Sequence, residues 1–366
     1  MSDSEKNHWI LWNQLYHYVG PVRFNQLLKV FGSAKAAWEA PAEAFVELGW
    51  GEKAIQALCM RENITIAPIL DRLSKLSVRL ITLADDAYPK VLRSIFDPPP
   101  LLYARGVLSF IDYPALAVVG TRRITRYGQE VIEALIPEFC SSGLTVVSGL
   151  ALGVDAVAHQ AALDAGGRTI AVLACGIDQI YPPANTHLGE EIINCGRGLL
   201  ITEFPPGTPT YPSNFPVRNR IISGISLGTL VIEAAEGSGT FHTAKAALEQ
   251  GREVFAIPGS IFSPFSAGTA KLIQSGAKPV TCAQDILEEL KVGAENAFQT
   301  VRERIPATED EEKLLALIGD EEKHVDELIK MADFSTDKVL STLTLLEMKG
   351  LVKNCGGGVY RGIGRK

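Results

Sequence analysis

The sequence ALAVVGTRR at residues 115–123 places a short apolar, β-branched run directly before a glycine and two arginines. Similar runs follow, and helical stretches separate most of them: residues 144–147, 169–173, 199–202, 229–232 and 253–257. Near-continuous apolar strands that alternate with helices are typical of a parallel sheet covered on both faces. The sequence therefore predicts an α/β, doubly wound, Rossmann-like domain, with its strands and helices over about residues 108–290.

The segment before this domain has a different pattern. All four tryptophans lie before residue 51, in helical patterns that predict a separate helical domain over residues 1–78, of the helix-hairpin-helix or SAM-like kind. Its glycine-containing turns at residues 19–23 and 48–52 look like helix-hairpin-helix turns, in which backbone N–H groups approach a DNA phosphate. A plain helical hairpin explains them equally well. A proline-rich connector at residues 80–105 then leads into the α/β domain, which we delimit at 79–292.

The C-terminal part predicts a third module. Residues 293–306 are a polar linker, and residues 307–366 fit a winged helix with helices at 311–318, 325–331 and 336–349 and a β-hairpin around glycines 356–358. The third helix carries acidic as well as basic residues, so contact with protein is as plausible as contact with DNA. This module also leaves open a transcription regulator with a nucleotide-sensing domain.

The composition limits the classes of protein. With 46% hydrophobic and 21% charged residues, the chain fits a soluble globular protein, and it has no apolar run of about eighteen residues that could span a bilayer. Its first residues are polar and acidic, unlike a secretory signal, so we expect a cytoplasmic protein without a membrane partner. The six cysteines are widely spaced, which disfavours a metal site. Because the net charge is −7, nucleic acid must bind at a local cluster.

Three glycine-containing loops follow predicted strands. In open α/β sheets such loops and the adjacent helix N-termini present backbone donors to anions at the carboxyl ends of the strands. For any single loop, a tight turn is an equally good explanation, but three in one domain indicate a phosphate site. The predicted phosphate-binding residues are Gly120, Thr121, Arg122 and Arg123 in the first loop, Ser148 and Gly149 in the second, and Gly237, Ser238, Gly239, Thr240 and Thr243 in the third.

Residues 203–220 read as a long proline-rich loop, and loops of this length are often functional. Phe215 stands close to Arg218 and Arg220, and an aromatic ring beside guanidinium groups can stack a base while the charges neutralise its phosphates. The alternative is structural, with Phe215 covering the sheet edge and the arginines paired with Glu203 and Glu233.

Enzymatic functions fit this sequence less well than binding of a phosphate-containing ligand. No dinucleotide-binding or P-loop fingerprint occurs, so neither NAD nor another cofactor is expected. Ser148, Asp155 and His159 have poor spacing for a triad, and we expect His159 to hold Asp155. The stronger rival is a nucleotide phosphoribohydrolase of the lysine-decarboxylase-like family, but Thr243 occupies the place of that family's catalytic glutamate. Glu203 or Glu233 could in principle substitute for it.

Several motifs, read together, resemble the DNA-processing protein A family, also called DprA or Smf. They are Gly-Thr-Arg at 120–122, Ser-Gly-Leu-Ala-Leu-Gly-Val-Asp at 148–155 with His159, Tyr181-Pro182 with Asn185, Phe-Pro-Val-Arg-Asn-Arg at 215–220, Glu233-Ala234, Ser-Gly-Thr at 238–240 with Thr243, and Pro258-Gly259. The resemblance implies a dimeric, non-catalytic protein that binds incoming single-stranded DNA during natural transformation and delivers it to the RecA recombinase.

The resemblance also assigns residues to the family's DNA-facing loops: Gly120, Thr121, Arg122, Ser148, Gly149, Phe215, Arg218, Arg220, Gly237, Ser238, Gly239 and Thr240. Two positions depart from the family's pattern. Leu150 stands where the family often has a second glycine, and Ala174-Cys175-Gly176 replaces a commoner glycine-containing turn.

Overall fold

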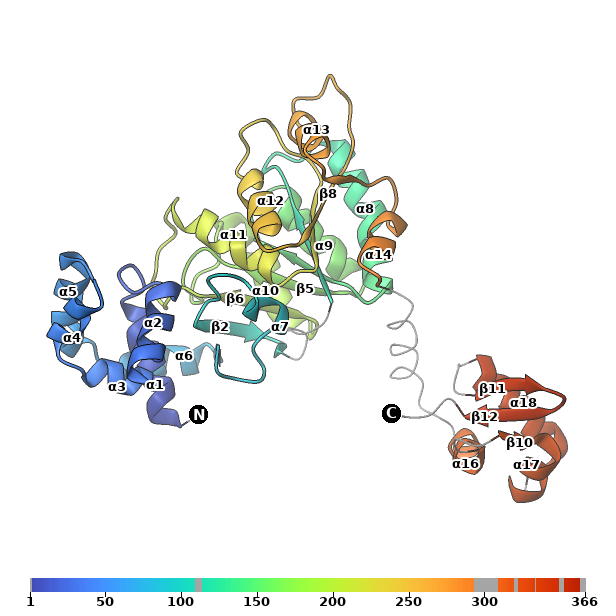
Figure 1. Cartoon of the computed structure of the whole chain (residues 1–366). Coiled ribbons are helices and arrows are strands. Elements are labelled where there is room, and N and C mark those ends of the chain that lie inside the picture. Colours follow the sequence, from blue (N-terminus) through green and yellow to red (C-terminus); the bar gives the residue numbers. More distant parts are fainter. Residues whose placement is uncertain are drawn as a thin grey trace. The chain divides into compact units, whose positions relative to one another are not determined.

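The computed structural model describes residues 2–108, 114–292, 309–318, 322–332, 334–348 and 352–362. The chain forms two compact units, Met1–Val292 and Gly293–Lys366, which are described separately (Figure 1). The linker predicted at 293–306 lies outside the described residues.

A nine-stranded sheet forms the centre of the first unit, in the order β1-β2-β6-β5-β4-β3-β7-β8-β9. The strands are β1 (Arg79–Thr82), β2 (Leu101–Gly106), β3 (Ala115–Val119), β4 (Thr145–Ser148), β5 (Arg168–Val172), β6 (Gly198–Thr202), β7 (Gly228–Val231), β8 (Glu253–Ala256) and β9 (Lys278–Pro279). All neighbours from β6 to β9 pair in parallel, whereas β2 pairs antiparallel with β6 and with β1. The predicted doubly wound, Rossmann-like sheet is confirmed, and each of the six predicted strands is present within about one residue of its expected bounds.

The proline-rich connector is more ordered than predicted. Residues 80–105 contain β1, β2 and the short helix α7 (Lys90–Arg93), so they extend the sheet by two strands instead of only leading into it. The prolines at 98–100 stand immediately before β2 and therefore remove no hydrogen bond from the ladder.

Side chains alternate between the two faces of the sheet, as strand geometry requires. In β3, Ala115, Ala117 and Val119 join a core with helices α7, α11 (Asn214–Gly224), α12 (Thr240–Glu249) and α13 (Ala267–Gln274). Leu116 and Val118 face α8 (Arg126–Ser141), α9 (Val154–Asp164) and α14 (Gln284–Glu289). On this second face, η3 (Pro183–Asn185) leads into α10 (Thr186–Asn194), which covers β5 and β6.

The chain reverses its direction of winding at the centre of the sheet. From β3 it proceeds through β4, β5 and β6 on one side, and then returns to β7 on the other side of β3. Such a topological switch point separates the loops that follow neighbouring strands and leaves a crevice at their carboxyl ends. Here the crevice lies beside the loops that follow β3, β4 and β7.

The N-terminal helices have the separate core that the tryptophans predict. They are α1 (Asp3–Gln14), α2 (Pro21–Phe31), α3 (Ala34–Glu39), α4 (Ala42–Glu47), α5 (Glu52–Cys59), η1 (Arg61–Asn63) and α6 (Ala67–Lys75). They nevertheless belong to the same compact unit as the sheet, because α1 packs against it. The Asn13 amide donates to the carbonyl of Glu203 at 3.1 Å, and its oxygen accepts from the Tyr103 hydroxyl at 2.9 Å.

The second unit is a winged helix, as predicted. Helices α16 (Glu309–Ile318), α17 (Val325–Ala332) and α18 (Thr336–Met348) pack with a three-stranded sheet of order β10-β12-β11. Its strands are β10 (Glu322–His324), β11 (Val352–Gly356) and β12 (Val359–Gly362), and β10 was not predicted. Among the described residues, no helix has the length and apolar character needed to cross a membrane.

Candidate nucleic-acid interface

A cavity of about 420 Å³ lies at the carboxyl edge of the sheet, where the winding reverses. Its lining comes from the end of β3 and the loop after it, the loop after β4 with the start of α9, helix α11, and the turn before α12 with the first turn of that helix: Val119, Gly120, Arg122, Ala151, Asp155, Phe215, Pro216, Arg218, Asn219, Ile222, Ser238, Gly239, Thr240, His242 and Thr243. Three segments predicted to bind phosphate and the segment predicted to stack a base therefore meet at one cavity.

Backbone hydrogen bonds connect the loop after β3 to the segments that follow β7 and β4. The N–H of Thr121 donates to the carbonyl of Glu233 at 2.8 Å, and the N–H of Val154 donates to the carbonyl of Thr121 at 3.1 Å. Gly153, with φ of 78°, completes the junction, because a Cβ there would lie 2.4 Å from the Thr121 carbonyl oxygen. The loop after β3 is thus fixed from both sides, while the side chains of Arg122 and Arg123 remain exposed.

Arg122 and Phe215 form the charged and aromatic part of the cavity. The Arg122 guanidinium carbon lies 5.0 Å from the centre of the Phe215 ring, a distance typical of cation–π contact. Phe215 belongs to α11, which begins at Asn214, so the segment predicted as a loop up to residue 220 is helical from that point. The helix brings Phe215 to the cavity and holds it half-buried.

The loop after β4 uses its polar groups internally. Asp155 Oδ2 accepts from the backbone N–H of Gly149 at 3.1 Å and of Ala151 at 3.4 Å. Ser148 is fully buried, and its hydroxyl donates to the carbonyl of Val118 at 2.7 Å. Burial raises the pKa of Asp155, and the charge of Arg218 opposes that shift. Ser148 and Gly149, both predicted to bind phosphate, therefore have their donors engaged within the protein.

Arg218 lies under the cavity and is only 3% exposed. Its Nη1 donates to the carbonyl of Gly149 at 2.7 Å and also to the carbonyl of Val172. Burial lowers the pKa of Arg218 to about 10, so the side chain is still a cation near neutral pH. It supplies positive charge to the floor of the cavity while its Nη1 binds backbone oxygens and its Nε donates to the side-chain oxygen of Asn219.

The turn after β7 leaves its backbone accessible from outside. Gly237 and Gly239 are exposed, and a Cβ built on either would meet no atom within 4 Å. The Ser238 hydroxyl lies 3.0 Å from the Thr240 hydroxyl. Both hydroxyls stand at the N-terminus of α12, where the helix dipole favours an anion. Thr243, one turn further along α12, also lines the cavity.

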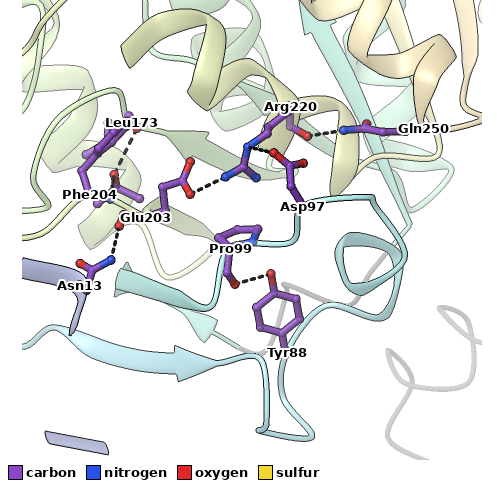
Figure 2. Close-up of polar contacts among 10 residues, drawn as sticks. Asn13, Tyr88, Asp97, Pro99, Leu173, Glu203, Phe204, Arg220 and Gln250 are labelled. Carbon is purple, nitrogen blue, oxygen red and sulfur yellow. Dashed lines mark hydrogen bonds and ion pairs between the residues drawn. The ribbon is translucent and has the colours of Figure 1, made fainter. Parts of the chain in front are cut away.

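Arg220 does not line this cavity, and its guanidinium is held by Glu203 and Asp97 (Figure 2). Its guanidinium contacts Glu203 at 2.5 Å and Asp97 at 3.2 Å, and its side chain is 11% exposed. The amide of Gln250 donates to the Arg220 carbonyl at 2.8 Å. Burial raises the pKa of Glu203, and the charge of Arg220 opposes it. The predicted contact of Arg220 with DNA is not supported by this position, and its pairing with Glu203 follows the structural alternative.

The residues weighed for catalysis are engaged elsewhere. His159 was expected to hold Asp155, but this expectation is wrong, because its Nδ1 lies 2.6 Å from the Thr169 hydroxyl. Glu233, considered as a substitute acid, accepts from the N–H and the hydroxyl of Thr125 at 2.9 and 2.6 Å. Glu203 is paired with Arg220.

Four residues that line the cavity were not among the predicted site residues: Ala151, Asp155, Asn219 and His242. The first three lie inside the motifs at 148–155 and 215–220, and His242 stands directly before Thr243, so their place in these segments was the signal available. Conversely, Thr121 accepts at its hydroxyl from the N–H of Arg123 at 3.1 Å, and neither residue lines the cavity.

Comparison with known proteins identifies the family. Residues 79–291 match the family model of DNA recombination-mediator protein A, and residues 299–358 match that of the DprA winged helix domain. The chain is 45% identical over 214 residues to DNA processing protein DprA of Bacillus subtilis, covering 58% of this chain and 71% of that protein. It is 34% identical to protein Smf of Synechocystis sp., covering 99% and 100%.

Solved structures agree with these matches. DNA processing protein A of Streptococcus pneumoniae superposes with a TM-score of 0.67 at 35% identity, covering 77% of this chain and 97% of that one. DNA processing protein A of Helicobacter pylori, whose structure concerns its single-stranded DNA binding mode, gives a TM-score of 0.52 at 31% identity, covering 58% and 96%. The chain therefore belongs to the DNA recombination-mediator protein A family, the family of DprA and Smf.

Proposed function

We propose that this protein binds single-stranded DNA, without sequence preference, across the cavity at the carboxyl edge of its sheet. The observation that carries the proposal is the Arg122 guanidinium over the Phe215 ring, beside the open turn at 237–240. A flexible strand can stack a base on such a ring while its phosphates meet the guanidinium and the helix N-terminus. The stiff stack of a duplex cannot present a base to that ring without being opened.

The comparisons supply independent support for this assignment. The Helicobacter pylori relative is described by its binding of single-stranded DNA, and it is 31% identical to this chain. The residues proposed here as contacts are Gly120, Arg122, Phe215, Ser238, Gly239, Thr240 and Thr243, with Arg218 supplying charge from beneath. Arg123 and Gly237 are exposed beside them and remain predicted phosphate contacts.

The direct test is a polarisation titration with labelled single strands and duplexes of equal length at several salt concentrations. We expect tighter binding of the single strand, little dependence on its sequence, and an affinity that falls steeply with salt. Equal or tighter binding of the duplex would contradict the proposal. Selective binding of one palindromic duplex would instead favour a transcription regulator that uses its winged helix.

We further propose that the protein acts in the cytoplasm as a homodimer that loads RecA onto the bound strand during natural transformation or other recombination. The description of its family as recombination mediators supports this role. The test is RecA filament formation on strands coated with single-strand-binding protein, with and without this chain. A rate of filament formation unchanged by the wild-type protein would contradict the loading role while leaving DNA binding intact.

Turnover of a nucleotide is not part of the proposal. Among the residues that the structure describes, Asp155 is the one carboxylate that lines the cavity, and its Oδ2 already accepts two backbone N–H groups. Incubation with nucleoside monophosphates, followed by chromatography for released base, addresses the phosphoribohydrolase alternative. Sustained release of base that an Asp155→Asn variant abolishes would replace the present proposal with an enzymatic one.

A further inference from the structure

A second, smaller hollow adjoins the cavity at Phe215, which lines both. It has a volume of about 50 Å³, and it shares Arg122, Ala151, Phe215 and Arg218 with the larger cavity. Its further lining comes from the loops after β4 and β5: Gly149, Leu152, Ala174, Tyr181 and Pro182. A hollow of this size is too small to enclose a base, so a ligand here must lie largely on the surface.

The surface around this hollow is aromatic and apolar. The Tyr181 ring centre is 6.1 Å from that of Phe215, at an interplanar angle of 60°. Tyr181 is 44% exposed and Leu152 is 45% exposed. Within the described part of the chain, no hydrogen bond involves the Tyr181 hydroxyl. An exposed ring without a polar partner, next to a second ring, offers a face to a planar apolar group.

The charge around the hollow favours a polyanion. Its charged lining residues are Arg122 and Arg218, and no carboxylate of the described part of the chain lines it. Arg122 belongs to both cavities, so its guanidinium can neutralise a phosphate between two neighbouring nucleotides. The whole protein has a net charge of −7, which makes a patch of this sign a local feature and not an average property of the surface.

We infer that Tyr181 is a second stacking ring, which carries the nucleotide next to the one stacked on Phe215. This inference rests on the proposed binding of single-stranded DNA and extends its path. The strand leaves the larger cavity past Phe215 and crosses the smaller hollow, with Arg122 at the phosphate between the two bases. Stacking requires a ring but no hydroxyl, so the position tolerates phenylalanine and does not tolerate leucine.

The test compares Tyr181→Ala, Tyr181→Leu and Tyr181→Phe with the wild-type chain, using oligothymidylates of about 4 to 16 nucleotides. Loss of one stacked base weakens binding by roughly 5- to 150-fold. We expect this loss for the alanine and leucine variants on the longer strands, a smaller loss on the shortest strands, and wild-type affinity for the phenylalanine variant. Thermal unfolding of each variant shows whether the fold is intact. Phe96→Ala is the matched control, because Phe96 is 93% exposed and lines neither cavity.

The outcomes separate this inference from the function on which it rests. If Tyr181→Ala binds every length like the wild type while Arg122→Ala binds weakly, the stacking role is overturned and the main cavity stands. If Tyr181→Leu binds as tightly as Tyr181→Phe, the position supplies only apolar surface, and the inference is also overturned. If the wild-type chain binds no single strand at any length, the proposed function fails and the inference fails with it.

Discussion

Arg218 Nη1 donates to the carbonyl oxygen of Gly149 at 2.7 Å, which joins helix α11 to the loop after β4. The contact is tight, because a Cβ on Gly149 would lie 2.5 Å from the guanidinium carbon. Arg218 is buried and Arg122 is exposed, so the two arginines of the cavity have different tasks. Arg218 connects the elements that form the cavity, and Arg122 is free to meet a ligand.

Arg218→Ala is expected to lower the free energy of unfolding by about 1–3 kcal/mol, because it leaves the carbonyls of Gly149 and Val172 without their donor in the interior. Urea unfolding followed by circular dichroism measures the change. Arg123→Ala serves as the control, since an exposed arginine without such contacts should change stability by no more than about 0.5 kcal/mol. Equal stability of the two variants would show that Arg218 does not connect these elements.

Arg122→Ala is expected to weaken binding of single strands while leaving the thermal unfolding temperature nearly unchanged. The lost phosphate contact should reduce the slope of log affinity against log salt by about 0.7, because fewer counterions are released. Titrations of one oligonucleotide at several salt concentrations give the slope. A slope equal to that of the wild type would remove Arg122 from the phosphate path.

The strands of the sheet could be predicted because their signal is local. Runs such as residues 115–119 are apolar on both faces, and the structure covers both faces with helices. Strands β1 and β2 lack this signal: β1 is the edge strand, β2 lies between β1 and β6, and a proline-rich stretch separates the two in the sequence. Helix α11 was mistaken for a loop because Pro216 occupies its first turn, where proline is in fact tolerated.

From the sequence one could predict which segments form the site, but not which of their side chains face it. Glycines and arginines after strands indicated which loops meet at the carboxyl edge, and the cavity lies there. Which side chains face the cavity depends on their internal partners, and these come from distant parts of the sequence. Arg220 and Arg218 differ by two positions on one helix, yet one pairs with Glu203 and Asp97 and the other lies under the cavity.

Arg220→Met is expected to destabilise the protein by about 3–5 kcal/mol, because it leaves the Glu203 carboxylate buried without its partner. Replacing both residues, as in Glu203→Leu with Arg220→Met, should cost less than the sum of the two single changes. Chemical unfolding of all four proteins gives this coupling energy. Additive losses would show that the two groups act independently. Because Arg220 does not line the cavity, the salt slope of DNA binding should be that of the wild type in every variant that folds.

At position 150 a glycine variant is expected to be more stable than an alanine variant, which is the reverse of their usual order in stability. Leu150 is fully buried with a φ of 57°, in the left-handed region that favours glycine. Both Leu150→Ala and Leu150→Gly lose the packing of the leucine side chain, at about 2–5 kcal/mol. Only glycine removes the strain of the left-handed backbone, which is about 1–2 kcal/mol for other residues. The glycine variant should therefore unfold at a higher urea concentration than the alanine variant, and the opposite order would contradict the strained backbone.

His159 is expected to make the protein less stable as the pH falls below about 6.5. Burial, aided by the nearby Arg218 charge, lowers the pKa of His159 from 6.5 to about 3. Between these values the unfolded chain binds a proton that the folded chain does not bind, so stability decreases with decreasing pH. At pH 5 the loss of stability relative to pH 7 is about 2 kcal/mol from this residue.

Asp155 and Glu203, whose pKa values are raised, act in the opposite direction. Their effect is common to the wild type and His159→Gln, so the difference in unfolding free energy between these two proteins isolates the histidine. That difference should shift by about 2 kcal/mol between pH 7 and pH 5 in favour of the variant, and a difference independent of pH would mean that the imidazole is accessible to protons in the folded state.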